Sequence, residues 1–265
     1  MSEPGQTLTV VTSCSAEGWR TYGRLMAETF DAMWPEGVRL LVYSEDAIPE
    51  LLAHSVPRAS WLPLLSESTG CAEFLERHRG NLAAQGRRPV PRARWKEKEL
   101  REGYNFRYDA YKFARKVFAI EAAARRTTTP WLLWLDADVM TVKDVRWRWL
   151  ESCLRGDLAF LDRSPYHSEC GFVAYRVGNP DVREFINDFA ALYATDRVFD
   201  LAEWHDSWVF DWLRRQRPRL RGVGLRYVSA SAPVDTMVEM RGALRHLKGR
   251  RKYEEGRRLD AAGRR

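Results

Sequence analysis

The chain has 265 residues, of which 45% are hydrophobic and 30% charged, and it carries a formal net charge of +7 with a pI of about 9.4. This composition is typical of one substantial globular domain, or of one domain with an appended subdomain. No stretch approaches the roughly 18 unbroken apolar residues of a transmembrane helix, so we expect no membrane-spanning segment.

The positive charge favours polyanionic partners, namely nucleic acid, an anionic membrane or a phosphorylated substrate. Much of it falls in residues 76–101 and 241–265. These segments either bind a polyanion or form a solvated face and a basic tail. The 11 tryptophans are many for this length and suit either a core or a pocket for a sugar or base.

The N-terminal residues lack the basic-then-apolar order of a signal peptide. The four cysteines, at positions 14, 71, 153 and 170, form neither a CxxC pair nor a dense cluster. We therefore expect reduced thiols and a cytoplasmic location.

The first predicted elements form a strand–helix–strand unit. Residues 7–13 are rich in β-forming residues and end in Ser-Cys-Ser, which predicts a strand followed by a helix cap. Residues 16–34 have helical spacing, and residues 38–43 predict a second strand. This order implies a parallel βαβ unit.

Residues 62–103 are irregular and basic and contain Pro89 and Pro91, which we interpret as an insertion or a mobile loop rather than core. A helix is predicted over 108–125. Four of its residues are expected to face the core: Val117, Phe118, Ile120 and Ala124. Its polar side should carry Lys112, Arg115 and Lys116.

Further helices are predicted over 144–155, over 181–194 and from about 203 to 214, with strands at 158–161, 171–175 and 225–228. The order of elements predicts an α/β fold with a mostly parallel central sheet flanked by helices.

The most informative motif ends a short apolar run, Trp131-Leu132-Leu133-Trp134-Leu135, which predicts a buried strand. Asp136 and Asp138 follow it, where ligands collect at the carboxyl edge of an open α/β sheet. Residues i and i+2 of an extended chain point the same way, so both carboxylates can face one Mg²⁺ or Mn²⁺ ion. The alternative is that the pair caps the next helix or turns the chain.

A second motif, H-x-x-G-x-x-K, lies near the C-terminus at His246, Gly249 and Lys252. An imidazole can complete the coordination of a Mn²⁺ ion already held by two carboxylates. A glycine lets the backbone approach a diphosphate, and a lysine supplies a point charge to it. Taken alone, this segment is better explained as a basic tail that contains one histidine, and the metal and diphosphate interpretation depends on its combination with Asp136 and Asp138.

With these two motifs the chain resembles nucleotide-sugar glycosyltransferases of the GT-A (Rossmann-like) fold, and in particular the glycogenin-like family. The resemblance implies that Asp136, Asp138 and His246 bind Mn²⁺ or Mg²⁺. It also implies that the donor diphosphate contacts Ala137, Gly249 and Lys252. The Lys-Pro-Trp ending usual in that family is absent, because Tyr253 follows Lys252. The similarity spans roughly residues 7–253, with 62–103 unmatched.

A second resemblance is to the Trp-His-Asp-Glu-Ser segment of blood-group A/B and α1,3-galactosyltransferases. It lies at Trp204-His205-Asp206-Ser207. The glutamate at the reaction centre of that family is replaced here by Ser207, so Asp206 becomes the candidate carboxylate, as a base or a positioning group. The resemblance implies that His205 holds the acceptor. The alternative is that Asp206 caps the helix that follows.

Other expected site residues come from the order of elements and from the GT-A resemblance. Thr12 and Ser13 should lie near the nucleotide base, and Tyr43 near the base and ribose. Arg107 and Lys112 are candidates to contact the donor sugar or phosphate, whereas Asp109 is as well explained as a helix cap. On the acceptor side, Glu169 is a candidate catalytic residue, and the acceptor pocket should contain Cys170, Gly171 and Trp204.

The resemblance thus implies one GT-A catalytic domain at residues 1–253, with 62–103 as a basic insertion, and a basic tail at 254–265. The expected donor is a nucleotide-diphosphate sugar, with UDP-sugar as the first choice. The basic segments favour 5-hydroxymethylpyrimidine in duplex DNA as the acceptor, as in a phage-type DNA glycosyltransferase acting in the host cytoplasm. One alternative acceptor is a surface glycan or lipid-linked sugar, and another hypothesis is a non-catalytic nucleic-acid-binding protein on the same scaffold. The oligomeric state is left open.

Overall fold

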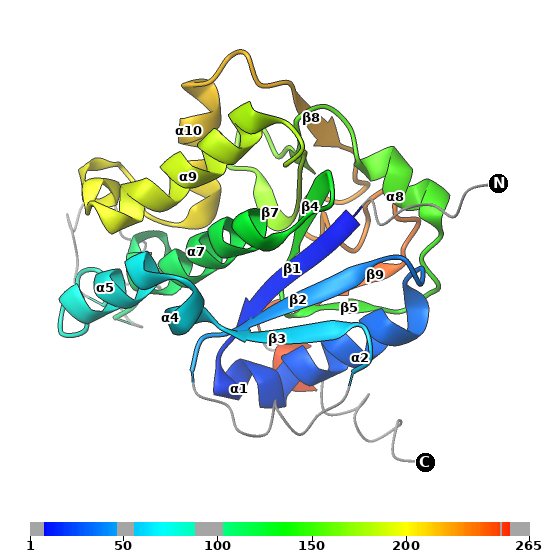
Figure 1. Ribbon diagram of the computed structural model, residues 1–265, viewed down its shortest axis with the longest axis horizontal. Helices are drawn as coiled ribbons and strands as arrows, with labels where there is room; N and C mark the ends of the chain where they lie inside the picture. The colour runs from blue at the N-terminus through cyan, green and yellow to red at the C-terminus, as the bar shows by residue number, and fades with distance from the viewer. Residues whose placement is uncertain (1–7, 47–55, 88–102, 250, 255–265) are drawn as a thin grey trace.

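A computed structural model describes residues 8–46, 56–87, 103–249 and 251–254 (Figure 1). The strands are β1 (Leu8–Cys14), β2 (Arg39–Ser44), β3 (Ala59–Pro63), β4 (Trp131–Leu135), β5 (Val139–Thr141), β6 (Leu158–Leu161), β7 (Glu169–Tyr175), β8 (Gly222–Leu225) and β9 (Leu244–His246). The helices are α1 (Ala16–Gly18), α2 (Arg24–Met33), α4 (Leu64–Glu67), α5 (Thr69–Arg77), α7 (Ala110–Arg126), α8 (Trp147–Cys153), α9 (Pro180–Ala194) and α10 (Asp206–Arg215). A π-helical segment joins α1 to α2 at Trp19–Gly23, and 3₁₀ turns lie at Phe106–Tyr108 and Arg197–Asp200.

The central sheet has seven strands in the order β3-β2-β1-β4-β7-β6-β8. All are parallel except β7, which runs antiparallel to both of its neighbours. The carboxyl ends of β1, β2 and β4 therefore meet at the same edge of the sheet as the amino end of β7. The expected α/β fold with a mostly parallel sheet flanked by helices is confirmed.

Helices cover both faces of this sheet (Figure 1). Residues of α5, α7, α9 and α10 pack together on one face, and residues of α2 and α8 pack on the other. Alternate residues of β4 enter opposite cores: Leu132 and Trp134 face α7, whereas Leu133 and Leu135 face α2. Strands buried on both faces explain the continuous apolar runs in the sequence.

A separate two-stranded sheet pairs β5 with β9 in antiparallel orientation. In its register Val139 is opposite His246, and Thr141 is opposite Leu244. This pairing brings a late segment of the chain to the residues that follow the Asp-x-Asp motif. Neither strand was predicted from the sequence, because three residues carry too little pattern to indicate a strand.

Most predicted elements are present with boundaries shifted by a few residues. The last strand of the central sheet is at Gly222–Leu225 instead of 225–228, and the helix expected from about 203 begins at Asp206. Asp109 is the N-cap of α7, where its side chain accepts a hydrogen bond from the Lys112 backbone N–H.

The interpretation of 62–103 as irregular is wrong for its first part. This part contains the end of β3 and the helices α4 and α5, and Leu64, Cys71 and Phe74 of these helices are fully buried. Helices of four and nine residues carry only a weak periodic signal, so the sequence pattern did not reveal them. Residues 88–102, including Pro89 and Pro91, lie outside the described residues, as does the tail at 255–265.

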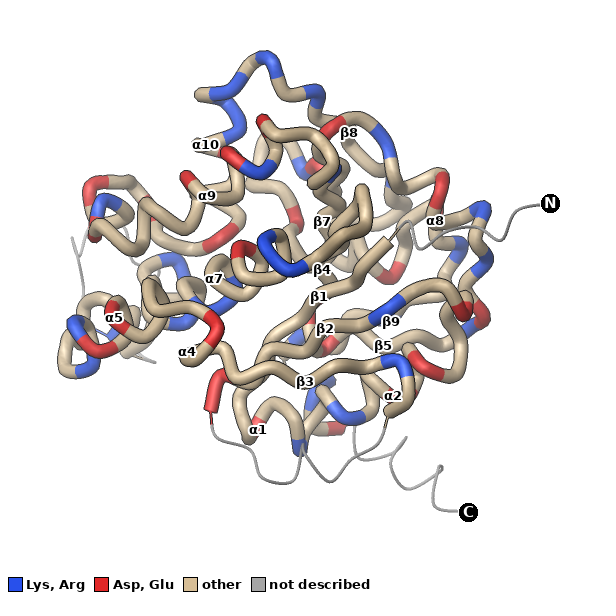
Figure 2. Tube along the Cα trace, in the orientation of Figure 1, with Lys and Arg blue, Asp and Glu red and all other residues tan. Residues whose placement is uncertain are grey.

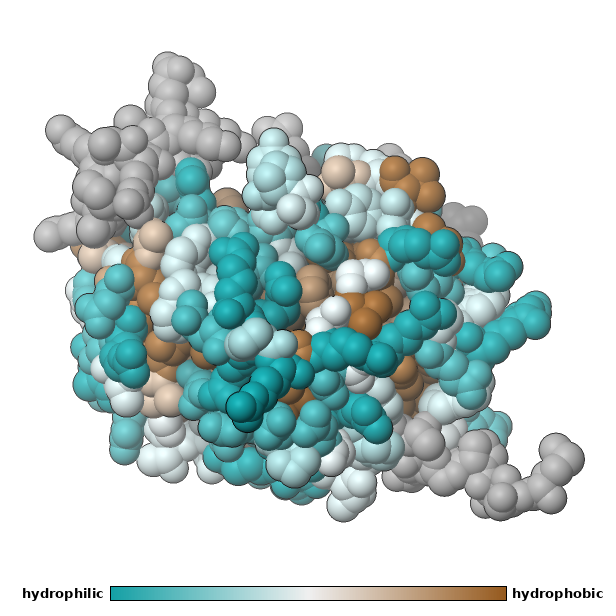
Figure 3. Space-filling model, turned by 90° about the horizontal axis from the view of Figure 1, so that it is seen from above, coloured by the Kyte–Doolittle hydropathy of each residue, from teal (hydrophilic) through white to brown (hydrophobic). Residues whose placement is uncertain are grey.

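The four cysteines are all buried and free. Among the described residues, no helix is both long and apolar enough to cross a membrane. The face shown in Figure 3 is mostly hydrophilic, and hydrophobic residues show on it in separate small patches. Basic residues recur from the end of α10 along the loop to β8 in Figure 2, where the sequence has Arg214, Arg215, Arg217, Arg219 and Arg221.

Candidate functional site

A pocket of about 610 Å³ opens at the carboxyl edge of the central sheet. Ser13 at the end of β1, Glu45 after β2 and Asp136 after β4 all line it. Lys112 and Lys116, one helical turn apart on α7, line it from one side. The pocket therefore lies where an open parallel sheet presents its strand ends to a ligand.

The Asp-x-Asp motif and the late histidine come together at this pocket. The Nε2 atom of His246 lies 3.1 Å from Asp138 Oδ1 and 3.7 Å from Asp136 Oδ2. Each of the three residues offers one ligand atom, and these atoms lie within 4.8 Å of one another. Two carboxylate oxygens and one imidazole nitrogen form a donor set that fits Mn²⁺ or Mg²⁺.

The two carboxylates are oriented by different partners. Asp136 Oδ1 accepts hydrogen bonds from Trp134 Nε1 (2.6 Å) and Lys116 Nζ (2.9 Å), which leaves Oδ2 facing His246. Asp138 Oδ2 pairs with Lys252 Nζ at 2.6 Å. Burial disfavours the charge on Asp138, but His246 and Lys252 outweigh it and hold its pKa well below the usual range. Asp138 is therefore available as an anionic ligand at neutral pH.

Gly171, at the start of β7, is packed against these ligand candidates. A Cβ atom at this position would lie 2.9 Å from His246 Cε1, 3.2 Å from Asp136 Oδ2 and 3.2 Å from Glu169 Oε1. The glycine was expected to permit close approach of a sugar or base; in the structure it lets the histidine ring approach the strand.

We expect Gly171→Ala to weaken Mn²⁺ binding by about 10- to 100-fold, because the new methyl group must displace His246 or Asp136. Gly37→Ala is the matched control, since a Cβ there meets no atom within 4 Å. Isothermal titration of both purified variants with Mn²⁺ measures the effect. Equal Mn²⁺ affinity in the two variants would contradict the assignment of His246 and Asp136 as ligands.

A lysine whose side chain is only 13% exposed connects Asp136 with Asp206 in the pocket. Lys116 Nζ lies 2.9 Å from Asp136 Oδ1, 2.7 Å from Asp206 Oδ2 and 2.7 Å from the Cys170 carbonyl oxygen. Burial opposes its charge, but the two carboxylates outweigh burial and raise the pKa of the ammonium above its ordinary value. Sequence periodicity placed Lys116 on the polar side of the helix and did not single it out. Its place on the polar side of the helix gave no sign of the ion pairs that it forms.

Asp206 is surrounded by a lysine, a histidine and a serine side chain. Its carboxylate contacts Lys116 and lies 3.9 Å from His205 Nδ1, and Ser207 Oγ lies 3.5 Å from Oδ1. Burial alone would raise its pKa; Lys116 and His205 instead hold the pKa below the usual range. The helix-cap alternative does not fit, because α10 begins at Asp206 itself and its N-cap residue is His205.

Glu169 lies beside the other side of the His246 ring, 4.0 Å from Nδ1. It pairs with Lys248, and Arg163 lies 3.6 Å from its carboxylate. A carboxylate behind a ligating imidazole fixes ring orientation in many metal sites. The distance of 4.0 Å is longer than a hydrogen bond, and Glu169 is not among the described residues that line the pocket.

Several expected site residues do not reach the pocket. Tyr43 is fully buried in the core on the α7 side, since its place in β2 points it toward that face. Thr12 is buried as well and does not line the pocket among the described residues. Trp204 is buried edge-on against Tyr108 and Phe199, so it packs the core instead of an acceptor.

Three more residues take positions other than those expected. Cys170 is buried and directs its carbonyl to Lys116, so its thiol does not face an acceptor. Arg107 lies 3.8 Å from Glu203, and neither residue belongs to the described lining of the pocket. Gly249 has a φ of 59°, a left-handed conformation that favours glycine, but it does not line the pocket either. Lys252, three residues further, does.

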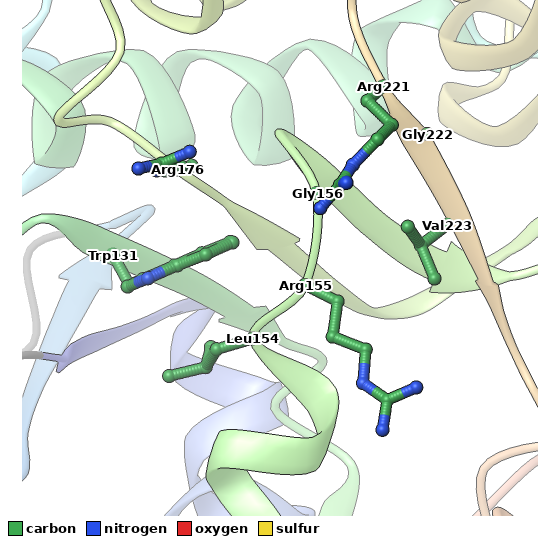
Figure 4. A pocket seen from close by; sticks show the side chains of 8 residues that line it. All are labelled: Trp131, Leu154, Arg155, Gly156, Arg176, Arg221, Gly222 and Val223. Atoms are coloured by element: carbon green, nitrogen blue, oxygen red, sulfur yellow. The ribbon is translucent and has the colours of Figure 1, made fainter.

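A second cavity, of about 730 Å³, lies at the opposite edge of the sheet, where β4, β6 and β8 begin (Figure 4). Arg155, Arg176 and Arg221 line it together with Trp131. Figure 4 shows their guanidinium groups lying apart instead of converging on one point. No carboxylate or histidine is among its lining residues in the described part of the chain, so it does not resemble the first pocket.

The sequence matches no protein-family model and no curated protein. Among solved structures, the chain is similar to mouse xyloside xylosyltransferase 1 in its apo form, at 11% identity and a TM-score of 0.46, covering 84% of this chain and 88% of that one. It is also similar to the apo glycosyltransferase GlyE of Streptococcus pneumoniae, at 10% identity and a TM-score of 0.46, covering 82% of this chain and 45% of that one. A third is the galactosyltransferase LgtC in complex with donor and acceptor sugar analogues, at 14% identity and a TM-score of 0.45, with coverages of 77% and 70%. TM-scores below 0.5 leave the function to be inferred from the residues of the pocket.

Proposed function

We propose that the chain is a metal-dependent glycosyltransferase, which moves a sugar from a nucleoside-diphosphate sugar to an acceptor hydroxyl. The observation that carries the proposal is the convergence of Asp136, Asp138 and His246 with Lys252 at the carboxyl edge of the sheet. Three candidate ligands and a lysine from distant parts of the chain form one site that suits a cation with a diphosphate.

Cleavage of a sugar–diphosphate bond builds negative charge on the leaving phosphate. A bound divalent ion would supply Lewis-acid stabilisation of that charge. Lys252 supplies a second positive charge at the same place, because its ammonium group reaches Asp138 Oδ2 at 2.6 Å. On nucleotide binding we expect this ammonium to exchange the carboxylate for a phosphate oxygen.

Asp206 and Asp136 both contact the ammonium group of Lys116. Its low pKa makes it a poor proton acceptor at neutral pH, since an effective general base has a pKa near the working pH. A carboxylate held ionised is better suited to stabilise positive charge that develops on the sugar ring. The ion pair therefore favours an electrostatic role for Asp206 over the role of a base.

We expect Asp206→Asn to reduce sugar transfer by about 100-fold or more while UDP binding in the presence of Mn²⁺ changes little. Asparagine keeps the shape of the side chain and removes its charge. Isothermal titration measures UDP binding, and release of UDP from a UDP-sugar measures transfer. Full activity in Asp206→Asn would remove this residue from the reaction.

For the acceptor we propose 5-hydroxymethylpyrimidine in duplex DNA, with a phage-encoded enzyme of the host cytoplasm as the biological setting. The support is compositional: a net charge of +7 and basic residues gathered in the sequence at 76–101 and 241–265. The arginines between α10 and β8 do not add to it, because that loop precedes β8 and lies toward the other edge of the sheet. The alternative acceptor is a surface glycan or lipid-linked sugar.

A screen of nucleotide sugars by UDP release, with and without hydroxymethylated duplex DNA, tests donor and acceptor together. Mn²⁺-dependent UDP release that DNA accelerates, with the sugar recovered on DNA, is the expected result. Hydrolysis with no label on DNA across several donors would reject the DNA acceptor and direct the search to glycans. No heat with UDP and Mn²⁺ in calorimetry, together with no hydrolysis of any donor, would reject the transferase and leave a non-catalytic scaffold.

A further inference from the structure

A second group of possible metal ligands lies outside the pocket. His167, Glu203 and His205 each offer one ligand atom, and these atoms lie within 4.8 Å of one another. His167 belongs to the segment between β6 and β7, whereas the other two residues precede α10. The sequence suggested His205 as a catalytic or acceptor-binding residue and gave no connection with His167.

The two distances to Glu203 are close to those between ligands of a small tetrahedral ion. Glu203 Oε2 lies 2.9 Å from His205 Nε2 and 3.5 Å from His167 Nε2. Ligands at 2.0–2.1 Å from a tetrahedral Zn²⁺ ion are separated by about 3.3 Å. Two histidines and one glutamate are also a donor set known from catalytic zinc sites with one open position.

The outer contacts fit the same interpretation. His205 is buried, and its second ring nitrogen, Nδ1, lies 3.9 Å from Asp206 Oδ1. The other oxygen of Glu203, Oε1, faces Arg107 at 3.8 Å, so Oε2 is left for the histidines. A carboxylate behind a ligating histidine, and a fixed second oxygen on a ligating carboxylate, are typical of built metal sites.

The segment that carries His167 is anchored to α10. Ser168 donates from its backbone N–H and its hydroxyl to the two carboxylate oxygens of Asp211, at 2.9 and 2.8 Å, and both residues are buried. The anchor holds His167 near His205 without a bound ion. The side chain of His167 is 38% exposed, so solvent and ions can reach the site.

We propose that His167, Glu203 and His205 form a second metal site, which binds Zn²⁺ or a similar borderline transition-metal ion. Imidazole nitrogens select such ions over Mg²⁺, which prefers oxygen ligands, so the two sites differ in metal preference. The site is connected to the first through the contacts His205–Asp206–Lys116–Asp136. The proposal rests on these distances and not on the transferase activity.

The test uses tag-free, chelator-stripped protein in which Asp138→Asn and His246→Ala have removed the first site. Zn²⁺ content after dialysis is measured by elemental analysis, and Co²⁺ titration reports tetrahedral coordination through visible absorption. We expect one Zn²⁺ per chain, and an affinity at least about 10-fold weaker when His167→Ala or Glu203→Gln is added.

His78→Ala is the matched control, because His78 also pairs with a carboxylate, Asp196 Oδ1 at 2.9 Å, but belongs to no such group of three. Its Zn²⁺ affinity should equal that of the parent. Circular dichroism of each metal-free protein verifies that the fold is kept, and two independent ligand variants guard against a folding defect in either. No bound Zn²⁺ in the parent, or equal affinity in His167→Ala, Glu203→Gln and His78→Ala, would overturn the proposal.

Discussion

Lys116→Met is expected to lower the free energy of unfolding by about 3 kcal/mol or more. The substitution leaves the carboxylates of Asp136 and Asp206 without the ammonium group that lies 2.9 and 2.7 Å from them. It also leaves the Cys170 carbonyl without its donor. An uncompensated buried charge costs more than the lost attraction, and methionine of similar length cannot supply a hydrogen bond. Denaturation with urea, followed by circular dichroism, measures the change.

Lys112→Met is the matched control, because Lys112 is on the same helix but exposed. It should change stability by less than about 0.5 kcal/mol. Adding Asp206→Asn to Lys116→Met removes one unpaired charge and should recover part of the loss. If Lys116→Met and Lys112→Met lower the free energy of unfolding equally, the ion pairs do not hold the site together. The same conclusion follows if adding Asp206→Asn to Lys116→Met recovers no stability.

Asp138→Asn is expected to weaken Mn²⁺-dependent UDP binding by at least about 100-fold and to abolish transfer with it. The change removes one of three candidate ligands, and Lys252 and His246 both lose their charged partner. Asparagine has nearly the same shape, so loss of binding reports the missing charge rather than a packing defect. Isothermal titration of UDP with Mn²⁺, and again with EDTA, measures the effect.

Asp144→Asn serves as the control, since Asp144 is exposed on the loop before α8. It should bind UDP and Mn²⁺ as the parent does. Unaltered Mn²⁺-dependent UDP binding in Asp138→Asn would show that the metal site is wrongly assigned. Weaker binding that EDTA does not change would mean that Asp138 acts on the nucleotide directly.

Local sequence patterns were sufficient to predict the main architecture. The alternation of strands and helices predicts a parallel sheet, and the apolar run before Asp136 predicts a buried strand that ends at the ligand edge. Hydrophobic spacing over 108–125 predicts α7 and its buried residues, such as Val117 and Phe118. Short elements could not be predicted in this way, because the strands at 139–141 and 244–246 contain only three residues each.

Burial depth was not determined by the sequence either. Tyr43 and Trp204 were expected at a ligand and are buried in the core, because strand and loop residues are directed by neighbours that a local pattern does not include. Aromatic residues are suited to both places. The same uncertainty applied to α4 and α5, whose buried residues lie among polar and acidic ones.

The sequence by itself determined the order of elements and the candidate ligands Asp136, Asp138 and His246, since each stands in a recognisable local motif. Only the tertiary structure decided which side chains surround these ligands and contact one another. Lys116 pairs with Asp136 across 20 positions of sequence and with the Cys170 carbonyl across 54, and His167 meets His205 through packing against α10. Such contacts depend on distance in space, and residues far apart in sequence leave no local signal of the partner that they will meet.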